Sequence, residues 1–362
     1  LEVDLHQIIP RFAPAHADYV NRLLGSQGTG GSTGVREAWT RLREAGAVAR
    51  EMLTSAAAET WDVPIDECEA VEGKVRHAAS ERELGYGELA SRAAQLPVPE
   101  TVFLKEPDEF RLIGTPQKRL DTRAKTNGSA GFGSDVRVPE MWIATVVGCH
   151  VVRGKHRRVD SVKAQAVPGV KKVINVANGV AVVAEHTWQA FKGASLLEID
   201  WDLGKDAGVD SGQIREQFRT LAAETGKQAA SAGDLTAALE QAAQTLEADY
   251  EVPFQAHACM EPMNCTAHVR EGACDVWVPT QNQTRTQQTA MKIAGLSERR
   301  VKVHTTFLGG GFGRRGETDF VADAVELSKR LQRPVQVIWT REQDTQHDYY
   351  RPATYNRMRG AL

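Results

Sequence analysis

The chain has 362 residues, of which 41% are hydrophobic, so it is long enough to form two or three domains with their own apolar cores. Lys and Arg total 44 against 47 Asp and Glu, and the formal charge of -3 gives no general field that would attract nucleic acid or an anionic membrane. Because of this charge balance, we expect no nucleic-acid partner. No run of apolar residues approaches the roughly 18 that cross a bilayer, so we also expect no transmembrane segment. The five cysteines form no C-x-x-C pair, which argues against a zinc site, an iron-sulfur site or a complete disulfide framework.

The first third of the chain has the periodicity of helices. Residues 35–54 place apolar side chains at a spacing of three to four, directly after a Gly/Ser/Thr loop at residues 27–34 (QGTGGSTG). A second helix is predicted over residues 86–95, after strand signals around Val75 and before Pro97.

Residues 124–204 change to a strand pattern and are predicted to form a compact α+β module. β-Branched runs indicate strands at residues 141–152, 171–178 and 179–186, followed by a helix at 187–196 and a strand at 197–203. The polar residues 204–212 are predicted to be a linker, and an Ala/Gln/Glu-rich helical region is predicted to follow to about residue 246.

The last third alternates strands and helices. Strands are predicted at residues 248–252, 273–278, 301–308 and 335–339, with helices near 283–293 and 318–331. Strand 301–308, a glycine loop, helix 318–331 and strand 335–339 together predict a βαβ unit.

The glycine loop of this unit, residues 309–316 (GGGFGRRG), has the composition of an anion-binding site. Backbone without side chains lets N–H groups approach a ligand closely, and the N-terminus of the next helix favours negative charge. Arg314 and Arg315 are expected to add forked donors for phosphate or carboxylate. Because the loop at residues 27–34 also precedes a helix, we expect one large anionic ligand to use both loops.

Two other interpretations of the loop remain open. Gly311-x-Gly313-x-x-Gly316 formally satisfies the dinucleotide fingerprint, so an NAD(P)-binding oxidoreductase is an alternative, although the acidic residue at Glu342 lies farther along the chain than usual and two arginines occupy the tight turn. A glycine-rich turn can also be an ordinary bulge or hairpin corner. The P-loop is excluded, because no Gly-Lys-Ser/Thr follows.

Residues 255–265 (QAHACMEPMNC) mix polar and apolar side chains in a way that is typical of the wall of a buried polar pocket. A satisfied core histidine at His257 and a capping carboxylate at Glu261 are preferred to catalytic roles. Cys259 and Cys265 are expected to be small buried hydrophobes. His347-Asp348 is interpreted as a solvated turn.

Several segments, in chain order, resemble the isoquinoline 1-oxidoreductase beta-subunit family of the molybdenum hydroxylases, within the xanthine dehydrogenase/aldehyde oxidase superfamily. The motifs that carry this resemblance include QGTGGSTGVREAW, HACMEPMNCTAHV, VWVPTQNQT and LGGGFGRRGETDF. The resemblance implies an α+β fold in which an α/β-hammerhead domain at residues 124–204 is flanked by parts of a molybdopterin-binding domain. These parts are an N-terminal region at residues 1–123 and a domain at 213–362 that is truncated at its C-terminal side.

The resemblance also implies a function. The cofactor would be molybdopterin cytosine dinucleotide with molybdenum, and the enzyme would hydroxylate N-heterocyclic aromatics or aldehydes with water as the oxygen source. Electrons would pass to a small partner protein that carries [2Fe-2S] clusters. The family's frequent twin-arginine export signal makes a periplasmic location an expectation from the resemblance, while the residues themselves leave the cytoplasm open.

The resemblance further implies which residues bind the cofactor, and no protein residue is expected to ligate the metal. Gln255 would hydrogen-bond an oxygen ligand of the metal, and the backbone of Phe312 and Gly313 would face the metal. The dinucleotide and the rest of the cofactor would contact Gln27, Gly30, Gly31, Ser32, Thr33, Gly310, Gly311 and Arg314.

The superfamily uses a glutamate base in a Gly-x-Gly-Glu-like motif near the C-terminus, and no such motif occurs in the C-terminal part of this sequence. We therefore expect the catalytic glutamate to lie outside this chain, and the chain to be a fragment that is inactive in isolation. A non-catalytic scaffold that docks the iron-sulfur subunit is the alternative from a different class of function.

Overall fold

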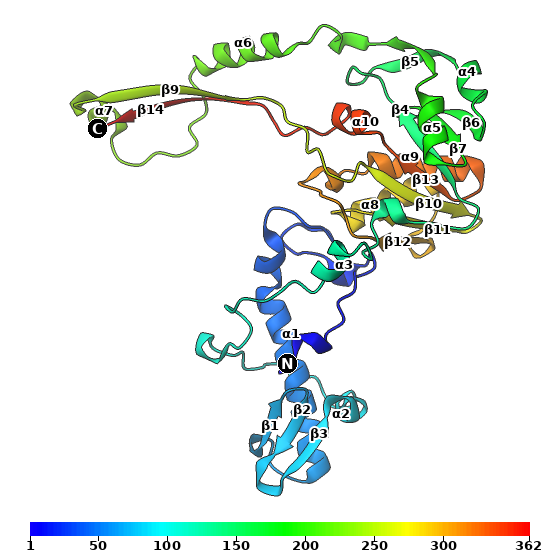
Figure 1. Ribbon diagram of the computed structural model, residues 1–362. Helices are drawn as coiled ribbons and strands as arrows, with labels where there is room; N and C mark the ends of the chain where they lie inside the picture. Colours follow the sequence, from blue (N-terminus) through cyan, green and yellow to red (C-terminus); the bar gives the residue numbers. More distant parts are fainter. The chain divides into compact units, whose positions relative to one another are not determined.

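The computed structural model describes residues 1–362, which divide into two compact units, Leu1–Ala130 (the first unit) and Gly131–Leu362 (the second unit). Figure 1 shows the helices and strands of both. The division into domains at residues 1–123, 124–204 and 213–362 stays a prediction. No helix combines the length and the apolar character that crossing a membrane requires.

The first unit is built on one long helix. Its elements are α1 (Thr33–Trp61), β1 (Cys68–Val71), β2 (Lys74–His77), β3 (Arg82–Gly85), α2 (Tyr86–Ala93) and α3 (Thr122–Thr126). The helix α1 begins just after the Gly/Ser/Thr loop, as predicted, and continues to Trp61 because the alanine-rich residues 56–58 favour a helix. The three strands form an antiparallel sheet in the order β1-β2-β3.

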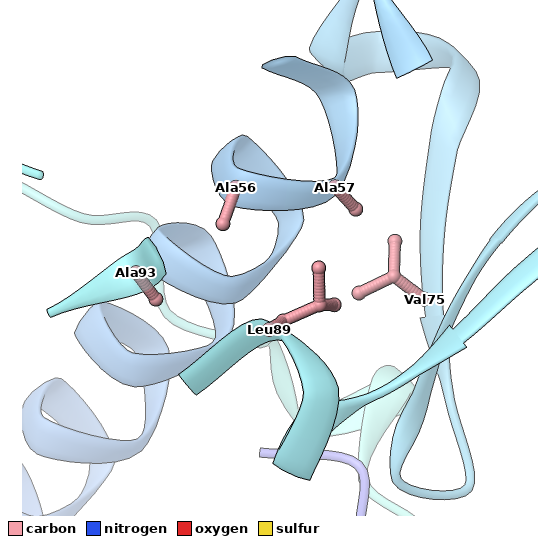
Figure 2. Packing of buried hydrophobic residues seen from close by; sticks show 5 residues of the cluster. All are labelled: Ala56, Ala57, Val75, Leu89 and Ala93. Carbon is pink, nitrogen blue, oxygen red and sulfur yellow. The ribbon is translucent and has the colours of Figure 1, made fainter. Parts of the chain in front are cut away.

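The core of the first unit lies where α1, α2 and β2 meet. Figure 2 shows the five buried side chains at its centre, Ala56, Ala57, Val75, Leu89 and Ala93. Three of them are alanines, so the two helices approach closely around the larger Leu89 and Val75. The predicted helix at residues 86–95 and the strand at Val75 are thus confirmed.

The second unit contains a seven-stranded mixed sheet in the order β12-β11-β10-β13-β4-β7-β6. Its strands are β4 (Trp142–Val147), β6 (Val170–Val176), β7 (Gly179–Ala184), β10 (Asn264–Arg270), β11 (Ala273–Val278), β12 (Val301–Thr305) and β13 (Val335–Ile338). The pairs β11/β12 and β13/β4 are parallel, and the other pairs are antiparallel. One sheet therefore includes strands from residues 124–204 and from residues 213–362.

Helices cover this sheet. The helices α5 (Thr187–Ala194), α8 (Gln283–Ala294) and α9 (Asp319–Leu331) pack against its strands. The helix α9 packs on β10 and β13 through a fully buried face that includes Phe320, Val321 and Leu327. It connects β12 to β13, which are parallel with two strands between them, so the predicted βαβ unit is confirmed.

The remaining elements of the second unit lie outside the large sheet. They are β5 (Lys155–Asp160), α4 (Val162–Gln165), β8 (Glu198–Asp202), α6 (Ser211–Ala222), α7 (Leu235–Gln241), β9 (Thr245–Val252), α10 (Arg341–Gln346) and β14 (Thr354–Ala361). Strand β5 pairs with β8, and β9 pairs with β14, both antiparallel. The helical region that was predicted to about residue 246 consists of two separate helices, α6 and α7, and ends at Gln241. Gly226 and Gly233 lie between α6 and α7, and Asp234 caps a new helix by accepting a hydrogen bond from the amide of Ala237.

Candidate functional site

The candidate site lies at one edge of the large sheet, where four segments meet. The parallel strands β11, β12 and β13 end at this edge and lead into residues 279–282, 306–316 and 339–348. Strand β10 is antiparallel to β11 and β13, so residues 255–263 enter the sheet at the same edge. Ligands of open α/β sheets commonly bind at the carboxyl ends of the strands, which makes this edge the place to look for a site.

The glycine loop has an unusual backbone. Gly310, Phe312 and Gly313 all have positive φ angles, of 98°, 54° and 114°. The amides of Gly310, Gly311 and Phe312 donate to no acceptor within the protein. Phe312 is 68% exposed despite its size. A left-handed aromatic residue and a run of unpaired amides are features of an anion-binding nest.

Both ends of the loop are held by side chains from neighbouring segments. The amide of Gly309 donates to Glu261 Oε2 at 2.9 Å, and the amide of Gly313 donates to Gln281 Oε1 at 3.0 Å. A side chain on either residue would disturb these contacts. A Cβ atom on Gly309 would lie 2.4 Å from Glu261 Cβ, and one on Gly311 would lie 2.5 Å from Gln281 Oε1. Close packing therefore favours glycine at 309 and 311, while positive φ angles favour glycine at 310 and 313.

Glu261 is a structural residue, in agreement with the sequence interpretation. Its side chain is buried and accepts four hydrogen bonds. Its Oε1 accepts from the amide of Ser134 and from Asn264 Nδ2, both at 2.9 Å, while Oε2 accepts from Gly309 and from Arg315 Nη2 at 3.1 Å. With every lone-pair direction used by the protein, this carboxylate has no capacity left to act as a base.

The two loop arginines do not face a ligand, contrary to the expectation from the sequence. Arg314 is 1% exposed and binds both carboxylate oxygens of Asp319, at 2.9 and 2.8 Å, and its amide donates to Gly311 O. Arg315 is fully buried and donates to Gly310 O at 2.8 Å and to Glu261. A buried guanidinium must pair with carboxylates and carbonyls, so these two side chains stabilise the loop conformation from its buried side.

His257 and Asp348 form a buried pair at the same edge. The distance from His257 Nδ1 to Asp348 Oδ1 is 2.8 Å, and the two side chains are 7% and 2% exposed. The interpretation of His347-Asp348 as a solvated turn is therefore wrong. His347 also turns inward, with its Nε2 at 2.8 Å from Cys149 O. The pairing partner of Asp348 is distant in the sequence, so local composition does not reveal it.

Gln255 lies two residues before His257, with an exposed side chain and a backbone that pairs with Arg351. The structure thus brings Gln255, Gly310, Gly311, Phe312, Gly313 and Arg314 to one edge of the sheet. Gln281 is the residue that the sequence analysis missed there. It directly follows the strand of the VWVPTQNQT motif, and its position beyond a parallel strand end was the signal.

The other predicted site residues belong to the first unit. Gln27 is buried, and its side chain accepts from the amide of His16 and donates to Pro14 O, both at 3.1 Å. Thr33 Oγ1 donates to Gly30 O at 2.8 Å. Gly30, Gly31 and Ser32 are exposed at the start of α1. The side chains of Gln27 and Thr33 therefore shape this loop, while Gly30, Gly31 and Ser32 are exposed to solvent at a helix N-terminus. Binding of one ligand by residues 27–34 together with residues 309–316 stays a prediction.

The dinucleotide fingerprint is not supported by the geometry. In that motif the third glycine permits close packing of the helix on the strand. Here a Cβ atom on Gly316 would meet nothing within 4 Å. A 3₁₀ turn over Arg314–Gly316 also separates the loop from α9, which begins at Asp319.

Comparison with known proteins agrees with these features. Residues 219–362 match the molybdopterin cofactor-binding domain family. The beta subunit of isoquinoline 1-oxidoreductase from Brevundimonas diminuta is 31% identical over 99% of this chain and 54% of its own length. Residues 219–362 thus have the sequence of a molybdopterin cofactor-binding domain, and nearly the whole chain is similar to the isoquinoline 1-oxidoreductase subunit. The resemblance found in the motifs is thus confirmed.

Other similar proteins are oxidoreductases of heterocyclic compounds by name. A nicotinate dehydrogenase chain from Pseudomonas putida is 29% identical over 95% of this chain and 30% of its own length. The solved structure of quinoline 2-oxidoreductase from Pseudomonas putida 86 is similar with a TM-score of 0.52 and 18% identity, over 69% of this chain and 37% of that one. This likeness confirms the mixed α and β fold expected for the family. The chain spans about half, or less, of the length of these relatives.

Proposed function

We propose that this chain is part of the cofactor-binding subunit of a hydroxylase that oxidises N-heterocyclic aromatic compounds or aldehydes. Water supplies the oxygen atom, and electrons pass to a small partner protein that carries [2Fe-2S] clusters. Relatives named for isoquinoline and nicotinate oxidation support the heterocyclic class. A relative named as a membrane-bound aldehyde dehydrogenase, 28% identical over 92% of this chain, supports the aldehyde class.

The observation that carries this proposal is the row of unpaired amides at Gly310, Gly311 and Phe312. These residues fit a ligand with several anionic oxygens, because three adjacent N–H donors lie on a left-handed turn that is held at both ends. When bound, a molybdenum cofactor supplies the redox chemistry of the reaction.

The residues of this chain bind and orient. The amides of residues 310–312 hold anionic oxygens of the cofactor, and the exposed side chain of Gln255 donates a hydrogen bond on the same side. Glu261 and Gln281 preserve the shape of the loop through Gly309 and Gly313. The exposed ring of Phe312 is placed to cover the ligand or the substrate and to exclude water. No residue of the site is assigned as a proton acceptor, since Glu261 is fully engaged.

The loop of the first unit is proposed to bind the dinucleotide part of the cofactor. Gly30, Gly31 and Ser32 are exposed at the N-terminus of the 29-residue helix α1, where unpaired amides and the helix dipole favour phosphate. The cytosine form of the dinucleotide is part of this proposal and follows from the family.

Analysis of the purified full-length protein for molybdenum and, after hydrolysis, for cytidine monophosphate tests the proposal. We expect close to one molybdenum atom and one cytidine monophosphate per chain. A protein produced with molybdate in the medium that contains neither would contradict the proposal and would favour the scaffold alternative.

A further inference from the structure

The imidazole of His257 is fixed in one orientation by Asp348. The carboxylate of Asp348 accepts from the backbone amide of His257 and lies 2.8 Å from its Nδ1. The Nε of Arg314 is 3.3 Å from the same carboxylate. Because a carboxylate flanked by a guanidinium accepts hydrogen bonds, we assign the hydrogen of the imidazole to Nδ1. The other ring nitrogen, Nε2, is therefore the one available for a further interaction.

Nε2 of His257 points toward the glycine loop and makes no hydrogen bond in the protein. A Cβ atom on Gly313 would lie 3.4 Å from Nε2, the closest atom to that position. The absence of a side chain at Gly313 thus leaves the nitrogen open on the loop side. The His257 side chain is only 7% exposed, so an unpartnered polar nitrogen is held at a nearly buried position beside the row of free amides.

We infer that His257 Nε2 is a further ligand-binding group of the loop and accepts a hydrogen bond from an N–H or O–H group of the molecule whose anionic oxygens the amides of residues 310–312 bind. Asp348 is a positioning residue, which fixes the ring, and Arg314 positions Asp348 in turn. The inference rests on the proposed function for the identity of the ligand. The local geometry explains why the sequence places a histidine here: a rigid ring can offer one nitrogen to a carboxylate and the other to a ligand.

Two substitutions of His257 distinguish the role of Nδ1 from the role of Nε2. His257→Asn keeps an amide that can reach Asp348 but has no atom at the position of Nε2. His257→Gln places its terminal amide near the position of Nε2. His304→Gln is the matched control, because His304 also pairs with an aspartate, with its Nε2 at 2.7 Å from Asp275 Oδ1, and lies on β12.

The measurement is the rate at which purified full-length protein loses molybdenum during dialysis, together with the unfolding temperature. We expect His257→Asn to lose molybdenum about tenfold faster than the unsubstituted protein, as the loss of one hydrogen bond implies. We expect His257→Gln to recover most of the retention, and His304→Gln to behave like the unsubstituted protein. Retention by His257→Asn within a factor of about two of the unsubstituted protein would overturn the inference.

A second measurement needs no substitution and covers the case in which the variants do not fold. Diethyl pyrocarbonate acylates accessible imidazole nitrogens, and the modified histidines are identified by mass spectrometry. We expect His257 to react in protein from molybdate-free medium and to be protected in molybdenum-loaded protein, while the exposed His186 reacts in both. Equal reaction of His257 in both preparations would overturn the inference. Failure of the unsubstituted protein to contain molybdenum would instead contradict the proposed function.

Discussion

The Oε2 atom of Glu261 lies between Gly309 N, at 2.9 Å, and Arg315 Nη2, at 3.1 Å. Through this one atom the segment that enters β10 is tied to the start of the glycine loop and to a guanidinium buried beneath it. The shape of the loop therefore depends on a charge pair whose members come from two segments far apart in the sequence.

Glu261→Gln should destabilise the second unit. The substitution preserves the size of the side chain but leaves the fully buried Arg315 without its anionic partner. Breaking a buried pair by neutralising one member costs about 3 kcal/mol of unfolding free energy. Urea denaturation measures this loss. The control is Glu317→Gln, which breaks the partly exposed pair with Arg285 and should cost about 1 kcal/mol or less. Equal midpoints for the two variants would contradict the structural role of Glu261.

Asp323 should make the protein less stable as the pH rises. Burial within α9 is the main cause that raises the pKa of this carboxyl from 3.8 to about 8, and the nearby Asp319 adds to the effect. The folded state therefore holds a proton that the unfolded state releases at lower pH, so stability falls between about pH 4 and pH 8 and is constant above the folded pKa.

Asp323→Asn tests this dependence. The amide oxygen of the new side chain can still accept from Asn178 Nδ2, which donates to Asp323 Oδ1 at 2.9 Å. We expect the stability of the variant not to fall between pH 4 and pH 8. The variant should therefore be more stable than the unsubstituted protein at pH 8 and about as stable at pH 4. Chemical denaturation at both pH values measures the difference. Parallel stability profiles for the two proteins would show that Asp323 does not titrate in this range.

The cysteines should react with alkylating reagents in an order set by burial. Cys265 is fully buried, and burial raises its pKa well above the usual value. Burial also raises the pKa of Cys274 to about 12. Among the five free cysteines, Cys68 is half-buried and the other four are buried. Mass spectrometry after iodoacetamide treatment should show Cys68 modified first, and Cys265 and Cys274 only after unfolding. Early modification of Cys265 would contradict the packing around β10.

The βαβ unit around the glycine loop was predictable because its signals are local. Apolar periodicity separates β12, α9 and β13, and glycines mark the turn between them. Strand β10 was missed because it is buried along nearly its whole length while carrying polar residues such as Asn264 and Thr266. An alternating pattern does not appear in a strand that is covered on both faces.

The partners of charged side chains could not be predicted in the same way. The composition of the loop suggests that Arg314 and Arg315 face an anion, yet their anions are Asp319, Asp348 and Glu261 of the protein itself. Asp348 and Glu261 lie on other segments and approach only after the sheet has formed. The free nitrogen of His257 and the role of Gln281 were hidden for the same reason.

The molybdenum content of Gly311→Ala, compared with that of Gly316→Ala, tests the central claim that residues 309–316 bind the cofactor. A methyl group on residue 311 would contact the flexible end of Gln281 and displace it from the amide of Gly313, so the fold should survive while the loop is distorted. A methyl group on residue 316 meets open space. We predict that Gly311→Ala unfolds at nearly the same temperature as the unsubstituted protein but retains little molybdenum, while Gly316→Ala retains all of it. Full molybdenum content in a folded Gly311→Ala protein would contradict the claim.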